Sequence, residues 1–87
     1  MKALVIYKSV SGFTRRYAEW IAEELPAELL AHQDVRPETM KQYDLIVFGG
    51  PLHAVGIDGL DLIKNNRPAL SGKRVIVFAV GASPPRE

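Results

Sequence analysis

The chain has 87 residues, of which 47% are hydrophobic and 24% charged, and this balance is typical of one small globular domain. Eleven basic and ten acidic residues leave a formal net charge of +1, without the basic excess that nucleic-acid binding needs. The absence of cysteine excludes disulfide bonds, thiolate metal sites and a cysteine nucleophile. Without an apolar run of about 18 residues or a signal-peptide pattern, we expect no transmembrane segment and a cytoplasmic location.

Three short apolar runs predict strands that are buried on both faces of a parallel sheet. They comprise residues 3–7, 45–48 and 75–80. A weaker strand is predicted at residues 29–32, and it contains His32, for which we expect a structural or exposed position. Small residues follow each main run, at positions 9–12, 49–51 and 81–83.

Helical periodicity separates the predicted strands. An apolar side chain recurs every four residues at Phe13, Tyr17, Ile21 and Leu25, which predicts a helix. Pro26 ends this helix, and Trp20 at the margin of the stripe is expected to serve packing rather than function. A second, shorter helix is predicted around residues 60–63, with Asp58 as its N-cap.

Alternating strands and helices predict an α/β fold with three layers, in which helices cover both faces of a parallel sheet. Ligands of such sheets bind outside the carboxyl ends of the strands. All three small-residue loops follow strand ends, so we expect them to gather at one edge of the sheet and to form the functional site.

The first loop has the composition of a phosphate site. Ser9, Ser11 and Thr14 offer three hydroxyl donors at the start of a helix, whose amides and dipole attract anions. Gly12 allows a sharp turn and a close backbone approach. Helix capping alone would need only one of these hydroxyls. The loop lacks the lysine of a nucleotide-triphosphatase loop and the three glycines of a dinucleotide fold, while a site for a simple phosphate ester stays open.

The pattern Ser9-x-Ser11-Gly12-x-Thr14 after a buried strand resembles the phosphate loop of flavodoxins. Residues 49–56 are similar to the second loop of that family, and residues 81–83 stand where its third loop begins. The flavodoxin-domain proteins akin to menaquinone-type protoporphyrinogen oxidases have the most similar pattern. The resemblance implies a flavodoxin-like sandwich with strand order 2-1-3-4, from which the family's fifth strand is missing.

The resemblance also implies an FMN cofactor and a role for each loop. The phosphate would be held by Ser9, Val10, Ser11, Gly12, Phe13 and Thr14. One side of the isoalloxazine ring would lie along Pro51, Leu52, His53 and Ala54, and its pyrimidine edge against Gly81, Ala82 and Ser83. We expect no catalytic side chain and no metal, because the flavin supplies the redox chemistry.

Electron transfer or flavin-dependent oxidoreduction is therefore the implied function, with a redox protein or a quinone-type acceptor as partner. The alternative is a flavodoxin-like interaction module that has lost its flavin. Two departures from the family bear on this choice: His53 stands where an aromatic ring usually stacks, and residues 81–87 contain no aromatic side chain. His53 could contact the ring or relay a proton, or it could face solvent.

The end of the sequence differs from the family pattern, because flavodoxins continue with a helix, a fifth strand and a last helix. We expect residues 1–87 to be a single flavodoxin-like domain that forms the N-terminal portion of a longer one. A self-associating short form and an inactive remnant are the other interpretations. The run from Val75 to Val80 would be an apolar edge strand, through which two copies could associate.

Overall fold

The computed structural model describes residues 2–8, 12–53, 56–57 and 59–81. Its sheet contains four parallel strands in the order β2-β1-β3-β5. The strands are β1 (Ala3–Tyr7), β2 (Glu28–Ala31), β3 (Leu45–His53) and β5 (Arg74–Gly81). The predicted α/β class and the order 2-1-3-4 of the parallel strands are thus confirmed. A two-residue strand, β4 (Gly56–Ile57), pairs antiparallel with the end of β3.

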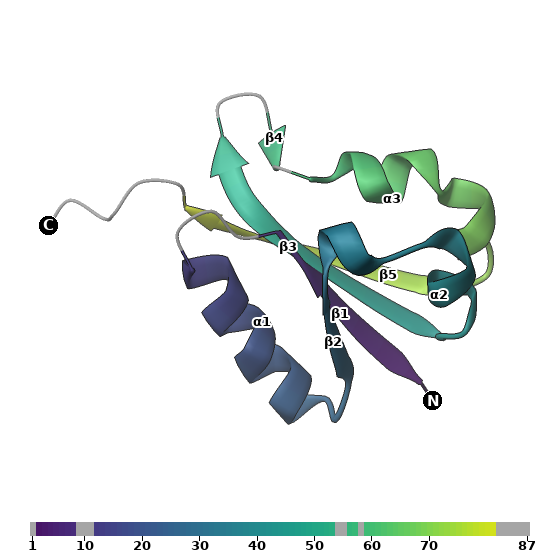
Figure 1. Cartoon of the computed structure of the whole chain (residues 1–87), viewed down its shortest axis with the longest axis horizontal. Helices are drawn as coiled ribbons and strands as arrows, with labels where there is room; N and C mark the ends of the chain where they lie inside the picture. The colour runs from purple at the N-terminus through teal and green to yellow at the C-terminus, as the bar shows by residue number, and fades with distance from the viewer. Residues whose placement is uncertain (1, 9–11, 54–55, 58, 82–87) are drawn as a thin grey trace, which may run out of the picture.

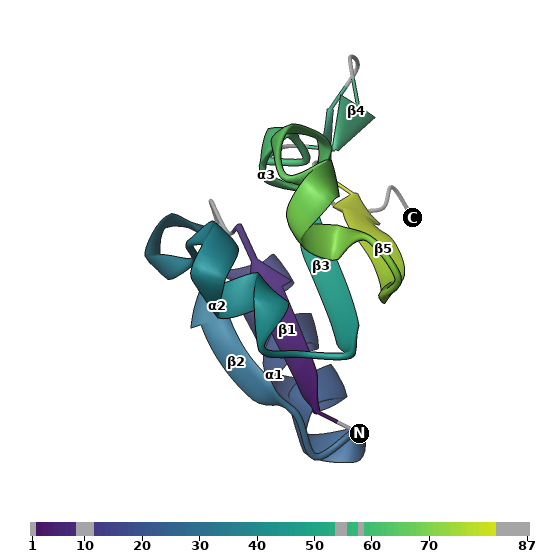
Figure 2. The ribbon, with the colours of Figure 1, turned by 90° about the vertical axis from the view of Figure 1, so that its right-hand side faces the viewer.

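Helices cover both faces of the sheet. On one face lies α1 (Phe13–Glu24), and on the other lie α2 (Pro37–Lys41) and α3 (Asp61–Asn65), as Figure 1 and Figure 2 show. Two short 3-10 helices, η1 (His32–Asp34) and η2 (Arg67–Leu70), complete the connections. This gives the three layers that the alternating elements predict.

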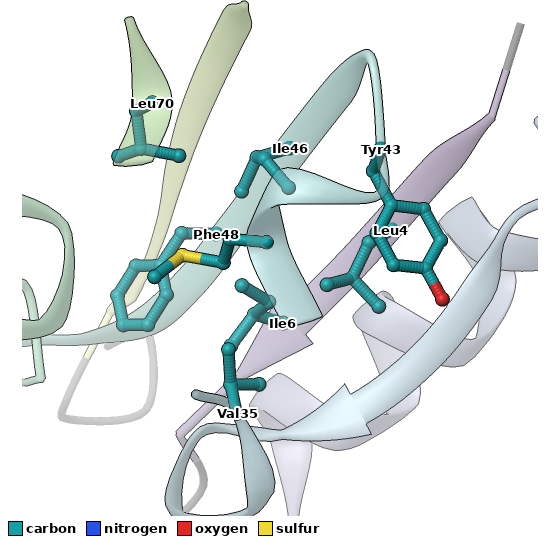
Figure 3. Close-up of a cluster of buried hydrophobic side chains, with 8 residues drawn as sticks. Leu4, Ile6, Val35, Tyr43, Ile46, Phe48 and Leu70 are labelled. Carbon is teal, nitrogen blue, oxygen red and sulfur yellow. The ribbon is translucent and has the colours of Figure 1, made fainter. Parts of the chain in front are cut away.

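The central strands β1 and β3 each contribute side chains to two cores, one on each face of the sheet, because successive residues of a strand point to opposite faces. The core beneath α2 and α3 contains Leu4, Ile6, Val35, Met40, Tyr43, Ile46, Phe48 and Leu70 (Figure 3). The core beneath α1 contains Ala3, Val5, Ala18, Ala22, Leu45 and Val47. Burial on both faces explains why β1 and the first half of β3 read as continuous apolar runs.

The face of α1 that packs on the sheet differs from the predicted stripe. Its buried residues are Thr14, Ala18 and Ala22, whereas Tyr17 is 48% exposed and Trp20 is 60% exposed. Small side chains let the helix axis approach the sheet closely, and the aromatic residues lie off this line of contact. Trp20, which was expected to serve packing rather than function, is thus not buried by the described residues.

The end of the third strand is also placed differently. β3 continues through residues 49–53, which were predicted to be a loop, because β5 pairs with it as far as Leu52. Leu60 rather than Asp58 occupies the N-cap position of α3, and Asp58 itself lies outside the described residues. His32 follows β2 and begins η1 instead of ending a strand. α2 and β4 were not predicted.

Candidate functional site

The carboxyl ends of β1, β3 and β5 meet at one edge of the sheet. Tyr7 pairs with Gly49, and Gly49 pairs in turn with Phe78. The amide of Lys8 donates to the carbonyl of Gly49 over 2.9 Å, which extends this contact past the end of β1. The loop that follows β1 therefore starts beside the second half of β3.

Gly12 sets the start of α1 at this edge. It occupies the N-cap position with a φ of 93°, in the left-handed region that favours glycine. The amide of Arg16 donates to the carbonyl of Gly12 over 3.1 Å, which closes the first turn of the helix. Because glycine has no side chain, the usual cap by a serine or threonine at this position is absent. Ser9, Val10 and Ser11 lie outside the described residues.

The first turn of α1 contains two more residues of the predicted phosphate site. Phe13 is the first residue of the helix, and Thr14 is buried, with 3% of its surface exposed. No acidic residue lies in this turn, so no carboxylate there opposes the partial positive charge of the helix terminus. The terminus is thus suited to an anionic group.

The second and third predicted segments lie side by side. Pro51, Leu52 and His53 are the last three residues of β3, and Leu52 pairs with Gly81, the last residue of β5. β4 lies against the same end of β3, where Leu52 pairs with Ile57. Two residues of different predicted loops, far apart in sequence, are therefore register partners.

Three predicted contacts of the flavin ring lie outside the described residues: Ala54, Ala82 and Ser83. The described residues of the site thus come from the start of α1, the end of β3 and the end of β5. They are Gly12, Phe13, Thr14, Pro51, Leu52, His53 and Gly81.

Two further residues at this edge were not predicted. They are Lys8, which follows β1, and Gly59. A Cβ atom on Gly59 would lie 3.0 Å from Cδ of Lys8 and 3.0 Å from Cζ of Phe48. Gly59 has a φ of +86°, so close packing and backbone conformation both favour glycine there. Only the tertiary structure brings Gly59 against the residue that follows β1.

His32 lies near the same edge. It follows Ala31, which pairs with Tyr7 at the carboxyl end of β1. Its side chain is half-buried, and its Nδ1 atom is buried without a hydrogen-bond partner among the described residues. The sequence predicted a structural or exposed position for His32 but not its place beside the end of β1.

Chemically, the described residues offer the backbone amides at the start of α1 and the buried hydroxyl of Thr14, beside the paired ends of β3 and β5. Within these residues, no group of three or more His, Asp and Glu side chains could hold a metal ion. Among the helices that the structure describes, none has the length and apolarity to cross a membrane. The start of α1 is thus the part of this edge that is suited to an anionic group.

Comparison with known proteins identifies the family of the chain. A family model described as a flavodoxin domain matches residues 4–87. An uncharacterised protein of Methanocaldococcus jannaschii is 41% identical over 54 residues, which are 61% of this chain and 36% of that protein. The chain thus matches little more than a third of this relative's length.

Two solved structures share the fold. The two-electron reduced flavodoxin of Megasphaera elsdenii is 20% identical with a TM-score of 0.81, over 98% of this chain and 69% of that chain. A mutant flavodoxin of Fusobacterium nucleatum, solved with flavin mononucleotide bound, is 18% identical with a TM-score of 0.69. This match covers 92% of the present chain and 51% of that flavodoxin.

Proposed function

The chain belongs to the flavodoxin domain family, and on this premise we propose that it binds FMN and takes part in electron transfer or flavin-dependent oxidoreduction. Bound FMN would supply the redox chemistry, while the protein would hold and orient it. The Fusobacterium nucleatum flavodoxin of the same fold, which was solved with FMN, supports this cofactor.

The observation that carries the proposal is the start of α1. Gly12, not Ser11 or Thr14, occupies the N-cap position, so capping does not account for the hydroxyl residues around it. A phosphate group does, because it accepts hydrogen bonds from hydroxyls and from the first amides of a helix. We assign the phosphate to Ser9, Val10, Ser11, Gly12, Phe13 and Thr14.

The flavin ring is assigned to the ends of β3 and β5. Leu52 and Gly81 are register partners, so a planar group beside one segment lies close to the other. Pro51, Leu52, His53 and Ala54 would run along the ring, and Gly81, Ala82 and Ser83 would meet its pyrimidine edge. His53 would replace the aromatic side chain that flavodoxins usually stack there, and its imidazole could contact the ring or relay a proton.

The implied partners are a redox protein or a quinone-type acceptor. Because the chain carries a formal net charge of +1, we expect its partner to lack the basic docking surface that would suit a strongly acidic flavodoxin. A flavodoxin-like interaction module without flavin is the competing function, and titration with flavin separates the two.

The test is titration of the purified 87-residue chain with FMN, followed by flavin fluorescence. We expect the fluorescence to be quenched on binding, and we expect riboflavin, which lacks the phosphate, to bind much more weakly. Fluorescence that stays unquenched at saturating FMN would refute the proposal. Equal binding of FMN and riboflavin would refute the assignment of the phosphate loop.

A matched pair of variants locates the site. Ser11→Asp places a negative charge in the proposed phosphate loop and is expected to abolish FMN binding through repulsion of the phosphate. Ser71→Asp introduces the same charge in the exposed turn before β5, at the opposite edge of the sheet, and should leave binding unchanged. Equal behaviour of the two variants would contradict the proposed location.

A further inference from the structure

The charged residues are unevenly distributed along the chain, although their charges nearly cancel in total. Between Glu19 and Glu38 the sequence contains six acidic residues and one arginine. Between Leu62 and Gly81 it contains four basic residues and no acidic one. The first segment comprises the second half of α1, β2, η1 and the start of α2, and the second comprises most of α3, η2 and β5. The segment from α3 to β5 is therefore strongly basic.

A pocket of about 220 Å³ lies where this basic segment meets α2. Its lining comes from both ends of α2, the end of α3 and η2, and consists of Pro37, Lys41, Asn65, Asn66, Pro68 and Ala69. Since α2 packs against η2, two segments that are distant in sequence form the walls. The lining contains no acidic residue, and the side chain of Lys41 is exposed. The pocket thus combines a cation with two amide side chains and two proline rings.

Hydrogen bonds to backbone carbonyls strengthen the positive character of the pocket. Nζ of Lys73 donates to the carbonyl of Lys41 over 3.0 Å and also to the carbonyl of Tyr43, at the end of α2. Without this ammonium group, the partial negative charge of these carbonyls would oppose a bound anion. Nδ2 of Asn66 donates to the carbonyl of Leu62 over 2.8 Å, which holds the Asn66 side chain at the end of α3.

Two more exposed basic residues flank the pocket, Lys64 in α3 and Arg67 in η2, and each is next to a lining residue. The acidic residues of α2 and α3 are Glu38 and Asp61, and each lies in the first turn of its helix, away from the basic last turn. In this part of the described chain, cationic side chains thus outnumber carboxylates around the pocket. The excess of positive charge favours an anionic ligand.

We propose that the pocket between α2 and η2 binds an acidic segment of a partner protein. One carboxylate of the segment enters the pocket beside Lys41, and neighbouring carboxylates lie near Lys64 and Arg67. Because the positive charge extends beyond the pocket, a chain with several carboxylates matches it better than a single anion does. The amide of Asn65 can donate to and accept from the peptide backbone of the segment. The proline rings offer rigid apolar surface to the methylene groups of a glutamate side chain.

The pocket and the predicted flavin site lie toward opposite edges of the sheet. Lys41 precedes β3 and Ala69 precedes β5, so the pocket is near the amino ends of these strands. The predicted flavin site is at their carboxyl ends. A partner that is held at the pocket therefore need not cover the flavin site. The proposal does not depend on FMN binding, and either one can fail without the other.

The test is an NMR titration of the isotope-labelled 87-residue chain with a capped peptide of alternating glutamate and glycine. Exposed ion pairs are weak and screened by salt, so we expect a Kd of about 0.1–1 mM at low ionic strength, and a higher Kd when salt is added. The side-chain amides of Asn65 and Asn66 and the backbone amides of η2 should shift most. Absence of shifts, or largest shifts at the start of α1, would overturn the proposal.

Two double variants with the same change in net charge locate the site. Lys41→Gln with Arg67→Gln removes two cations at the pocket and should weaken peptide binding about fivefold. Arg15→Gln with Arg16→Gln removes two cations from α1 and should leave the affinity nearly unchanged. All four side chains are exposed, and far-UV circular dichroism verifies that both variants are folded. An equal loss of affinity in both would show that only net charge matters, and the proposal would be wrong.

A pair of uncharged substitutions tests the pocket itself. Asn65→Ala removes an amide side chain from the lining, whereas Gln33→Ala removes an exposed amide side chain from η1. Only Asn65→Ala should weaken binding of the glutamate peptide, and equal affinities of the two variants would contradict a role for the lining. A single-stranded oligonucleotide with the same number of negative charges is the competing ligand. If it binds more tightly than the peptide, the partner is a nucleic acid and the proposal fails.

Discussion

The ring of Phe78 fills the space that a Cβ atom on Gly49 would need. Such an atom would lie 2.0 Å from Cζ of Phe78, far closer than real contacts allow. The two residues are register partners in β3 and β5, and Phe78 packs against the core beneath α1. A glycine is therefore required at position 49 for the packing of β5 against β3.

Gly49→Ala is expected to lower the free energy of unfolding by about 1–3 kcal/mol, because the added methyl group displaces the Phe78 ring. Urea denaturation measures this loss. In the background of Phe78→Leu, the same substitution should cost much less, because the ring is absent. Additive effects of the two substitutions would show that the contact does not determine the cost.

Gly12→Ala is expected to reduce both stability and FMN binding. An alanine at a φ of 93° costs about 1–2 kcal/mol, and relief of this strain moves the first amides of α1. Gly72→Ala is the matched control, since Gly72 also has a positive φ, of 80°, but lies in the turn before β5. The control should lose similar stability and keep its FMN affinity, as measured by thermal unfolding and fluorescence titration. Loss of affinity in both variants would assign the effect to global stability.

Thr14→Val tests the buried hydroxyl. The two side chains have nearly the same shape, so the variant should remain folded while it loses one hydrogen bond to the phosphate. Hydrogen bonds to charged groups contribute about 1.5–3 kcal/mol, so we expect FMN affinity to fall at least about tenfold. Thr39→Val makes the same change in α2, where Thr39 is half-buried, and should not alter the affinity. Unchanged affinity of Thr14→Val would exclude the hydroxyl as a phosphate ligand.

Tyr43 provides a test of stability at alkaline pH. Its hydroxyl donates to Oε1 of Glu28 over 2.6 Å, and this hydrogen bond, followed by burial and the charge of Glu28, raises the pKa of Tyr43. Because the pKa is higher in the folded state than in the unfolded state, the stabilisation is fully present below about pH 10. It is lost as the pH rises through the folded pKa.

Tyr43→Phe should therefore lower the free energy of unfolding by about 1 kcal/mol at pH 7 and flatten its decline above about pH 10. Urea titrations at several pH values measure both effects. Tyr17→Phe, on the exposed side of α1, should change neither. If the free energy of unfolding of Tyr43→Phe still declines steeply above about pH 10, the decline is caused by the titration of another group.

The sequence predicted those elements whose pattern of burial is regular along their whole length. β1 and residues 45–48 are apolar throughout because they are buried on both faces, and α1 has an amphipathic period that Pro26 ends. The hydroxyl and glycine pattern of residues 9–14 likewise predicted a sharp turn at Gly12 and a helix N-terminus beside it, and α1 begins at Phe13. Local composition was sufficient in these cases.

Contacts between distant segments decided the rest. β3 extends to His53 because β5 pairs with it as far as Leu52 and β4 pairs with Leu52 and His53. A glycine is needed at position 49 only because the ring of Phe78 occupies the space of a Cβ atom. α1 faces the sheet through Ala18 and Ala22, because their small side chains let the helix approach the sheet closely. Tyr17 belonged to the predicted apolar stripe, but its side chain is exposed.

The run of residues 75–80 illustrates the same division. Its apolar sequence determined that it forms a strand, as the fully buried runs of β1 and β3 do. Its exposure could not be read from composition, because an edge strand and a central strand of one sheet can have the same residues. The apolar run by itself predicted burial on both faces, and only the resemblance to flavodoxins indicated an edge. The tertiary structure places β3 on one side of β5 and, within the described residues, no strand on the other, which leaves Val75, Ile76 and Val77 exposed.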